Sequence, residues 1–160
     1  MKKSNGRSAV AGGVMAAMLV VGMAAVSTGA SAAEPRLVKL KGSDAMQYDV
    51  KVIQATPGEA LKVTLTAVSS MAKAEMAHNF VLLAKGTNAD SFAMEAAMAR
   101  DNNYIPKAKA AAILAQTKLA GGGETVEVIF NAPKEPGEYM YICTFPGHFI
   151  GGMKGKLIVK

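Results

Sequence analysis

The sequence predicts an all-β domain, a β-sandwich or barrel with one short helix. Apolar residues recur at every second position in several short runs, and turn-forming stretches such as TPGE and KEPGE separate these runs. A period of two places alternate side chains on one face of a strand, and short strands between turn signals are typical of sandwiches and barrels. The 160 residues suffice for one domain with a real core, and no internal repeat or linker interrupts them.

The strand pattern recurs from Arg36 to the C-terminus. The runs are RLVKLKG from Arg36, MQYDVKV from Met46, ALKVTLTAV from Ala60, HNFVLLAK from His78, TVEVIFNAP from Thr125, GEYMYICTF from Gly137 and GKLIVK from Gly155. In the third run, Leu61, Val63 and Leu65 share one face. Each run is therefore expected to form a strand.

Two segments favour helix. TNADSFAMEAAMARD places Asn88 before a run of good helix formers, as an N-cap would be. IPKAKAAAILAQTKLAGGGE is less clear, because propensity alone favours a helix from Pro106 to just before Gly121.

The first 32 residues have the features of a secretory signal peptide. Lys2, Lys3 and Arg7 precede an uncharged stretch rich in Gly and Ala, which ends in the small-residue sequence ASA. We expect residues 1–32 to be cleaved and residues 33–160 to form a single periplasmic or otherwise exported domain. The alternative is an uncleaved anchor, because residues 8–33 are long enough to span a bilayer, and membrane association is expected only in that case.

Charge and cysteine content exclude other classes. The formal net charge is +6, and without residues 1–32 fifteen Lys and Arg face twelve Asp and Glu. No basic run is present, so nucleic acid is not an expected partner. Cys143 is the only cysteine and has no disulfide partner. A free thiol is a liability in an oxidising compartment, which suggests that a metal protects it.

A group of soft and nitrogen donors lies near the C-terminus. Cys143 and His148 flank the turn TFPG, Met153 closes the same loop, and His78, the only other histidine, starts a distant run. Taken singly, these residues are common in cores or on solvated loops. Taken together, two imidazoles, one thiolate and one thioether suit copper, whereas zinc rarely takes thioethers and calcium and magnesium prefer oxygen. We therefore predict one copper ion per chain.

MAHNFVLL and CTFPGHFIGGMKGKLIVK resemble the cupredoxins, the small type 1 blue copper proteins, and within them the azurin and auracyanin group. QTKLAGGGETVEVIF is similar to the azurin stretch before the ligand loop, so the resemblance covers roughly residues 36–160. It implies a Greek-key sandwich or barrel of about eight strands with a short helical flap. It further implies that His78, Cys143 and His148 are equatorial copper ligands, that Met153 is axial, and that Asn79 steadies the loop with Thr144 as its partner.

The chain departs from the azurin pattern in three respects. Ala77 replaces the glycine whose carbonyl approaches copper, four residues rather than three separate His148 from Met153, and the common disulfide is impossible. The four-residue spacing is similar to that of the auracyanins. The resemblance also implies a strand over Ile113–Leu119, against local propensity, with Pro106–Ala112 as an irregular connection or short helix.

The function implied is single-electron transfer by Cu(I)/Cu(II) cycling between redox partners. Copper oxidases need further histidines, and both histidines here are already used, so an enzyme is not expected. The alternative is a copper carrier or store in the periplasm, for which the methionines at 71, 76, 94 and 98 are suggestive.

An apolar patch around His148 is the expected docking site for redox protein partners. Phe145, Pro146, Phe149 and Ile150 lie on a loop, where polar residues are usual. The alternative is that this loop is buried.

Overall fold

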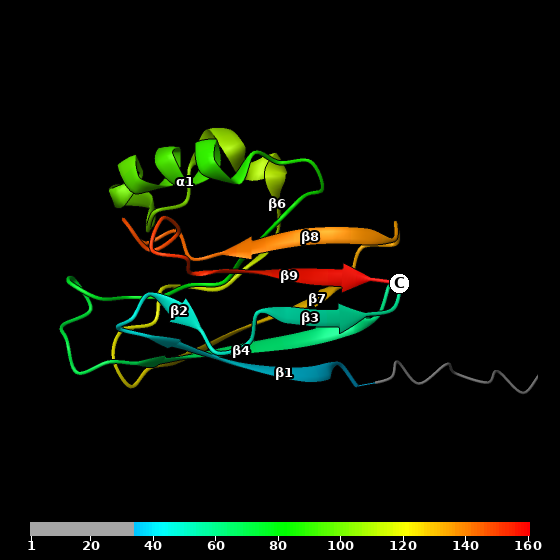
Figure 1. The fold of residues 1–160 in the computed structure, drawn as a ribbon, viewed down its shortest axis with the longest axis horizontal. Helices are drawn as coiled ribbons and strands as arrows, with labels where there is room; N and C mark the ends of the chain where they lie inside the picture. The colour runs from blue at the N-terminus through cyan, green and yellow to red at the C-terminus, as the bar shows by residue number, and fades with distance from the viewer. Residues whose placement is uncertain (1–33) are drawn as a thin grey trace, which may run out of the picture. The chain divides into compact units, whose positions relative to one another are not determined.

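Two β-sheets pack face to face in the computed structural model, which describes residues 34–160 (Figure 1). The predicted signal segment lies outside the described residues. One sheet has the strand order β2-β1-β4-β7 and the other has the order β3-β9-β8-β5-β6. The strands are β1 (Arg36–Ser43), β2 (Gln47–Tyr48), β3 (Val52–Ala55), β4 (Ala60–Val68), β5 (Val81–Leu83), β6 (Ile113–Gln116), β7 (Thr125–Asn131), β8 (Gly137–Ile142) and β9 (Lys154–Val159). The predicted all-β fold is confirmed.

The chain crosses between the two sheets early. It passes from β1 and β2 in the four-stranded sheet to β3 in the other, and then returns as β4. β1 and β4 therefore pair in parallel, with Leu40 opposite Leu65, and β3 pairs in parallel with β9. The pairs β4–β7, β5–β8 and β8–β9 are antiparallel. The pairing of β8 with β9 matters for the site, because it brings Cys143, just after β8, next to Met153, just before β9.

The main core lies between the sheets, where the predicted alternation is observed. Leu61, Val63 and Leu65 of β4 are fully buried and meet Tyr141 and Leu157 of the opposite sheet in one cluster. Burying each such side chain contributes about 1.5–3 kcal/mol relative to leaving it exposed.

A second, smaller core covers the outer face of β5 and β8. Helix α1 (Ala89–Met98) lies along this face in Figure 1, and Phe92 packs there against Val81 and Ile142. Asn88 caps the helix as predicted, because its side chain accepts a hydrogen bond from Ser91 N at 2.9 Å. In residues 34–160, no helix is long and apolar enough to cross a bilayer.

Three expected strands differ from the observed ones. The run MQYDVKV is divided between β2 and β3 at Asp49, whose carboxylate accepts hydrogen bonds from Lys41 N and Val50 N. The run from His78 contributes only β5 to the sheet proper. β6 follows the resemblance rather than helix propensity but ends at Gln116, after a short 3₁₀ segment, η2 (Lys107–Ala112).

Candidate metal centre

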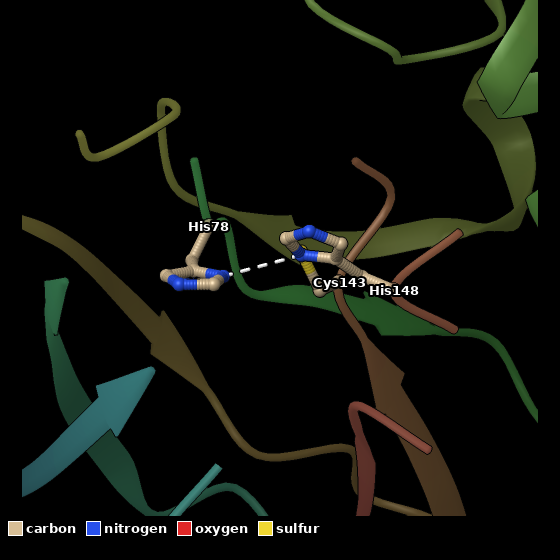
Figure 2. Close-up of side chains that lie close together, drawn as sticks. All are labelled: His78, Cys143 and His148. Atoms are coloured by element: carbon tan, nitrogen blue, oxygen red, sulfur yellow. Dashed lines mark hydrogen bonds between the residues drawn. The ribbon is translucent and has the colours of Figure 1, made fainter. Parts of the chain in front are cut away.

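Three of the predicted ligands converge at one end of the sandwich. Figure 2 shows His78, Cys143 and His148 directed toward one another from different segments. The Nδ1 atoms of His78 and His148 are 3.2 Å apart, and Cys143 Sγ lies 3.4 Å from His148 Nδ1. The donor atoms of all three residues lie within 4.8 Å of one another, and the three side chains are buried. Two nitrogens and one sulfur at these separations can surround a single ion.

His78 is positioned by a short bridge to the segment before β7. Its backbone N–H donates to Ala120 O at 2.9 Å, and its carbonyl accepts from Ala120 N at 2.8 Å. Two residues later, Phe80 N donates to the Thr117 hydroxyl at 3.0 Å. The stretch QTKLAGGGE therefore aligns the chain at His78 by backbone pairing, which is independent of the imidazole.

Cys143, His148 and Met153 are positioned by one closed loop. Cys143 follows the end of β8, and the turn to His148 needs Gly147, whose φ of 82° is unfavourable for other residues. His148 N donates to Phe145 O at 3.1 Å, and Met153 N donates to His148 O at 2.9 Å. Cys143 N then donates to Met153 O at 3.1 Å, so the backbone alone brings the three residues together.

The Asn79 side chain ties this loop to the His78 segment. Its Nδ2 donates to the Thr144 hydroxyl at 2.7 Å, and its Oδ1 accepts from Thr144 N at 2.8 Å. Both residues are buried, so neither bond competes with water. The pairing of Asn79 with Thr144 that the resemblance implied is present.

Met153 lies beside the imidazole of His78. A Cβ placed on Gly42 would be 2.7 Å from the Met153 methyl and 2.9 Å from the His78 ring, so both side chains pack on that glycine. The carbonyl of Ala77, which directly precedes His78, lies 4.0 Å from Cys143 Sγ and so is also close to the site. Sequence reasoning missed Gly42, although a glycine at a buried position of an alternating strand is a usable signal of close approach.

Burial determines the protonation of the site without a cation. It raises the pKa of the Cys143 thiol to about 12, and it lowers the pKa of His148 to about 4, with His78 adding to that shift. Burial likewise lowers the pKa of His78. Both imidazoles are therefore neutral and ready to bind a metal, whereas the thiolate needs a nearby cation to form.

The nitrogen of His78 that faces the other donors is Nδ1, which lies opposite His148 Nδ1. Its second ring nitrogen, Nε2, has no hydrogen-bond partner within residues 34–160. Two imidazoles, a thiol and an adjacent thioether form a soft donor set that fits copper.

The surface near the ligand loop is only partly as predicted. Phe145 and Phe149 are buried, and His148 itself is 2% exposed, whereas Pro146, Gly147 and Ile150 are exposed. Next to these exposed residues lies a groove of about 380 Å³, which is lined by Gly147 and Ile150 of the loop and by Met94 and Met98 of α1. The expected apolar patch is thus narrower at the loop than predicted and extends onto the helix.

Comparison with known proteins agrees with this site. The sequence model for copper binding proteins of the plastocyanin/azurin family matches residues 36–160. Azurin-1 of Alcaligenes xylosoxydans xylosoxydans is 40% identical over 123 residues, which cover 75% of this chain and 94% of that protein. Auracyanin A of Chloroflexus aurantiacus, a blue copper protein, has a TM-score of 0.68 at 32% identity, covering 79% of this chain and 99% of that one. The dithionite-reduced auracyanin of Roseiflexus castenholzii has the same TM-score at 31% identity, covering 78% and 96%.

These matches show the class of protein, which is a blue copper protein with a cupredoxin fold. The chain belongs to the plastocyanin/azurin family of copper-binding proteins. It is accordingly an electron-transfer protein that takes one copper, and the His-Cys-His group fits such an ion.

Proposed function

We propose that His78, Cys143 and His148 bind the copper and that Met153 is a weak axial ligand. The observation that carries this proposal is the convergence of two imidazole nitrogens and one sulfur within 4.8 Å in a buried site. The Met153 backbone is bonded to both Cys143 and His148, which keeps its thioether at the same site.

When bound, copper supplies one-electron chemistry by alternating between its +1 and +2 states. The protein's part is to keep the donor atoms in nearly the same positions in both states. The closed loop from Cys143 to Met153 and the Asn79–Thr144 pair restrict movement of the donors. Burial excludes water, so little solvent must reorganise around the site.

Titration of the copper-free protein with Cu(II) tests the site. An intense visible band, assigned to thiolate-to-copper charge transfer, should rise linearly and stop at one equivalent. Zinc added in parallel should give no colour and should be displaced by copper. A band that continues to rise well beyond one equivalent, or a preference for zinc with no blue form, would contradict the proposal.

We further propose that redox partners dock on the apolar rim formed by Pro146, Gly147 and Ile150. Ile150 is 86% exposed and lies two residues from His148, which offers a short route to the metal through one imidazole. A small apolar interface suits a transient encounter. Ile150→Glu should slow electron exchange with a partner, or self-exchange, and leave the copper spectrum unchanged.

A matched control is Leu37→Glu, which adds the same charge at an exposed apolar residue at the start of β1. The rate of electron exchange of this variant should remain at the wild-type value when it is measured by stopped flow at the same ionic strength. Equal slowing in both variants would indicate a net-charge effect and would remove the rim as the docking site.

We propose export to the periplasm or beyond, with cleavage after residue 32, and no catalytic activity of its own. The charged start and the ASA sequence support the first statement, and the use of both histidines at one site supports the second. The intact mass of the exported protein decides the processing. A mass that retains residues 1–32, with the protein in the membrane fraction, would instead support an anchor.

Exposed thioethers favour one alternative function, copper carriage. Met94 and Met98 are 70% and 87% exposed on one groove beside the loop, and thioethers bind Cu(I) well. If the protein is a carrier, replacing both with leucine should slow copper transfer to a chelator, whereas Met71→Leu should not. Equal transfer rates in both variants would leave electron transfer as the function.

A further inference from the structure

Tyr48 contacts the candidate copper site through the backbone of Asn79. It lies on the two-residue strand β2, is 2% exposed, and donates from its hydroxyl to Asn79 O at 2.5 Å. A buried phenol needs a hydrogen-bond partner, and here that partner is the residue directly after a predicted ligand. Tyr48 is the third residue of the alternating run MQYDVKV.

Asn79 is the junction between the two ligand segments. Its side chain binds Thr144 twice, and its carbonyl accepts from Tyr48. Asn79 directly follows His78, and Thr144 directly follows Cys143, so the side-chain bonds of Asn79 join the two segments next to these predicted ligands. The Tyr48 hydroxyl therefore holds the backbone carbonyl of the residue whose side chain binds Thr144.

We propose that Tyr48 is a positioning residue for the copper site. Its hydroxyl fixes the orientation of Asn79, and the Asn79 side chain in turn holds Thr144, the residue directly after Cys143. The proposal rests on the proposed role of Cys143 as copper ligand. Residues that orient the ligands of a metal also tune its redox potential, so the hydroxyl should affect the potential without touching the metal.

Tyr141 provides a matched control. It is also fully buried, its ring lies 5.4 Å from that of Tyr48, and its hydroxyl also donates to a backbone carbonyl, that of Val50, at 2.6 Å. Tyr48→Phe and Tyr141→Phe therefore each remove one hydroxyl and leave one carbonyl without its donor. Only the first carbonyl belongs to Asn79.

The two variants are compared in two states. With copper, Tyr48→Phe should shift the thiolate band and the reduction potential, whereas Tyr141→Phe should leave both within replicate scatter while losing a similar amount of thermal stability. The Thr144 N–H donates a hydrogen bond to Asn79 Oδ1. In the copper-free protein, hydrogen exchange of this amide should accelerate severalfold in Tyr48→Phe and should not change in Tyr141→Phe. The exchange measurement needs no metal, so it tests Tyr48 even if the copper assignment fails.

A double-mutant cycle completes the test. Thr144→Val removes the hydroxyl that Asn79 Nδ2 donates to, so its effect on the potential should be non-additive with Tyr48→Phe and additive with Tyr141→Phe. Unchanged band, potential and Thr144 exchange in Tyr48→Phe would overturn the proposal. Equal shifts in both tyrosine variants, or additivity in both cycles, would also overturn it, because Tyr48 would then serve only for packing.

Discussion

β4 and β5 are central strands of the two sheets, and they are buried in different ways. In β4, Leu61 and Val63 face the core and are fully buried, while Lys62 and Thr64 on the other face are half-buried. In β5, all three residues from Val81 to Leu83 are buried, because the core covers one face and helix α1 covers the other. The segment that leads into β5 carries His78, and β8, its covered neighbour, leads into Cys143.

This difference indicates how the fold excludes water from the proposed metal site. β5 and the end of β8, which adjoin the proposed ligands His78 and Cys143, are covered on both faces. The four-stranded sheet, with one face more exposed, contacts the site through Gly42 and Tyr48. The covering helix also packs on Phe149, which directly follows His148. The following changes test whether the double cover, rather than the sandwich alone, supports the site.

The largest effect is expected from uncovering β5. Phe92→Ala removes a fully buried ring of α1 and should lower the free energy of unfolding by about 3–5 kcal/mol. Denaturant unfolding of the copper-free protein measures this loss. Leu37→Ala, on the exposed face of β1, should cost no more than about 0.5 kcal/mol. Similar losses in the two variants would mean that the helix contributes no more than a surface residue does.

Gly42→Ala tests the contact that the four-stranded sheet makes with the site. The new methyl would overlap the Met153 methyl and the His78 ring, so unfolding free energy should fall by about 1–3 kcal/mol and copper binding should weaken. Copper titration followed by the visible band measures the second effect. Ser43→Ala, at the next position, serves as the control and should retain the wild-type titration curve. Unaltered copper binding in Gly42→Ala would show that this sheet does not constrain the ligands.

Met153→Leu tests the loop between β8 and β9 itself. The swap conserves volume and should cost less than about 1.5 kcal/mol of stability. An axial thioether adds little to binding but lowers the potential, so the variant should remain coloured and its reduction potential should rise. Voltammetry measures the shift. Loss of copper at moderate concentration would instead make Met153 a principal ligand.

The smallest effect is expected at a charge pair remote from the site. The hydrogen bond from the Arg36 guanidinium, 2.5 Å from Glu59, holds the pKa of that carboxyl below its usual range. The pair therefore adds stability above the unfolded pKa of about 4.3, and this stability is lost as pH falls through the lower folded value. Because the pair is partly exposed, it contributes less than about 1 kcal/mol.

Glu59→Gln should therefore flatten the loss of unfolding free energy between about pH 6 and about pH 3. Its copper spectrum at neutral pH should equal that of the wild type. If unfolding free energy fell more steeply at acid pH in the variant than in the wild type, the lowered pKa of Glu59 would be contradicted.

Much of the fold can be predicted from the sequence, because alternation of apolar and polar residues indicates a strand that is buried on one face. β4 is predicted to the residue, and Cys143, His148 and Met153 are grouped by their spacing around one turn. β5 is harder to predict, because the helix that buries its outer face packs on it from later in the chain. Local propensity also fails at β6, where sheet pairing with β5 outweighs the preference of an alanine-rich segment for helix.

The roles of Gly42 and Tyr48 could not be obtained from spacing. Both lie far from the ligand loop in sequence, and their contacts depend on how the two sheets face each other. The break after Tyr48 is similar, because it occurs where the Asp49 side chain bonds to the backbone. Such features are set by tertiary packing, which a periodic pattern does not encode.

The visible spectrum of Cys143→Ser after addition of Cu(II) tests the central claim most directly. Serine keeps the size and burial of the side chain but removes the sulfur, while His78, His148 and Met153 stay in place. We predict that the wild type gains an intense blue or green band at one equivalent of copper and that the variant gains none. A variant that remains coloured would contradict the account, because the band would then arise from a donor other than Cys143.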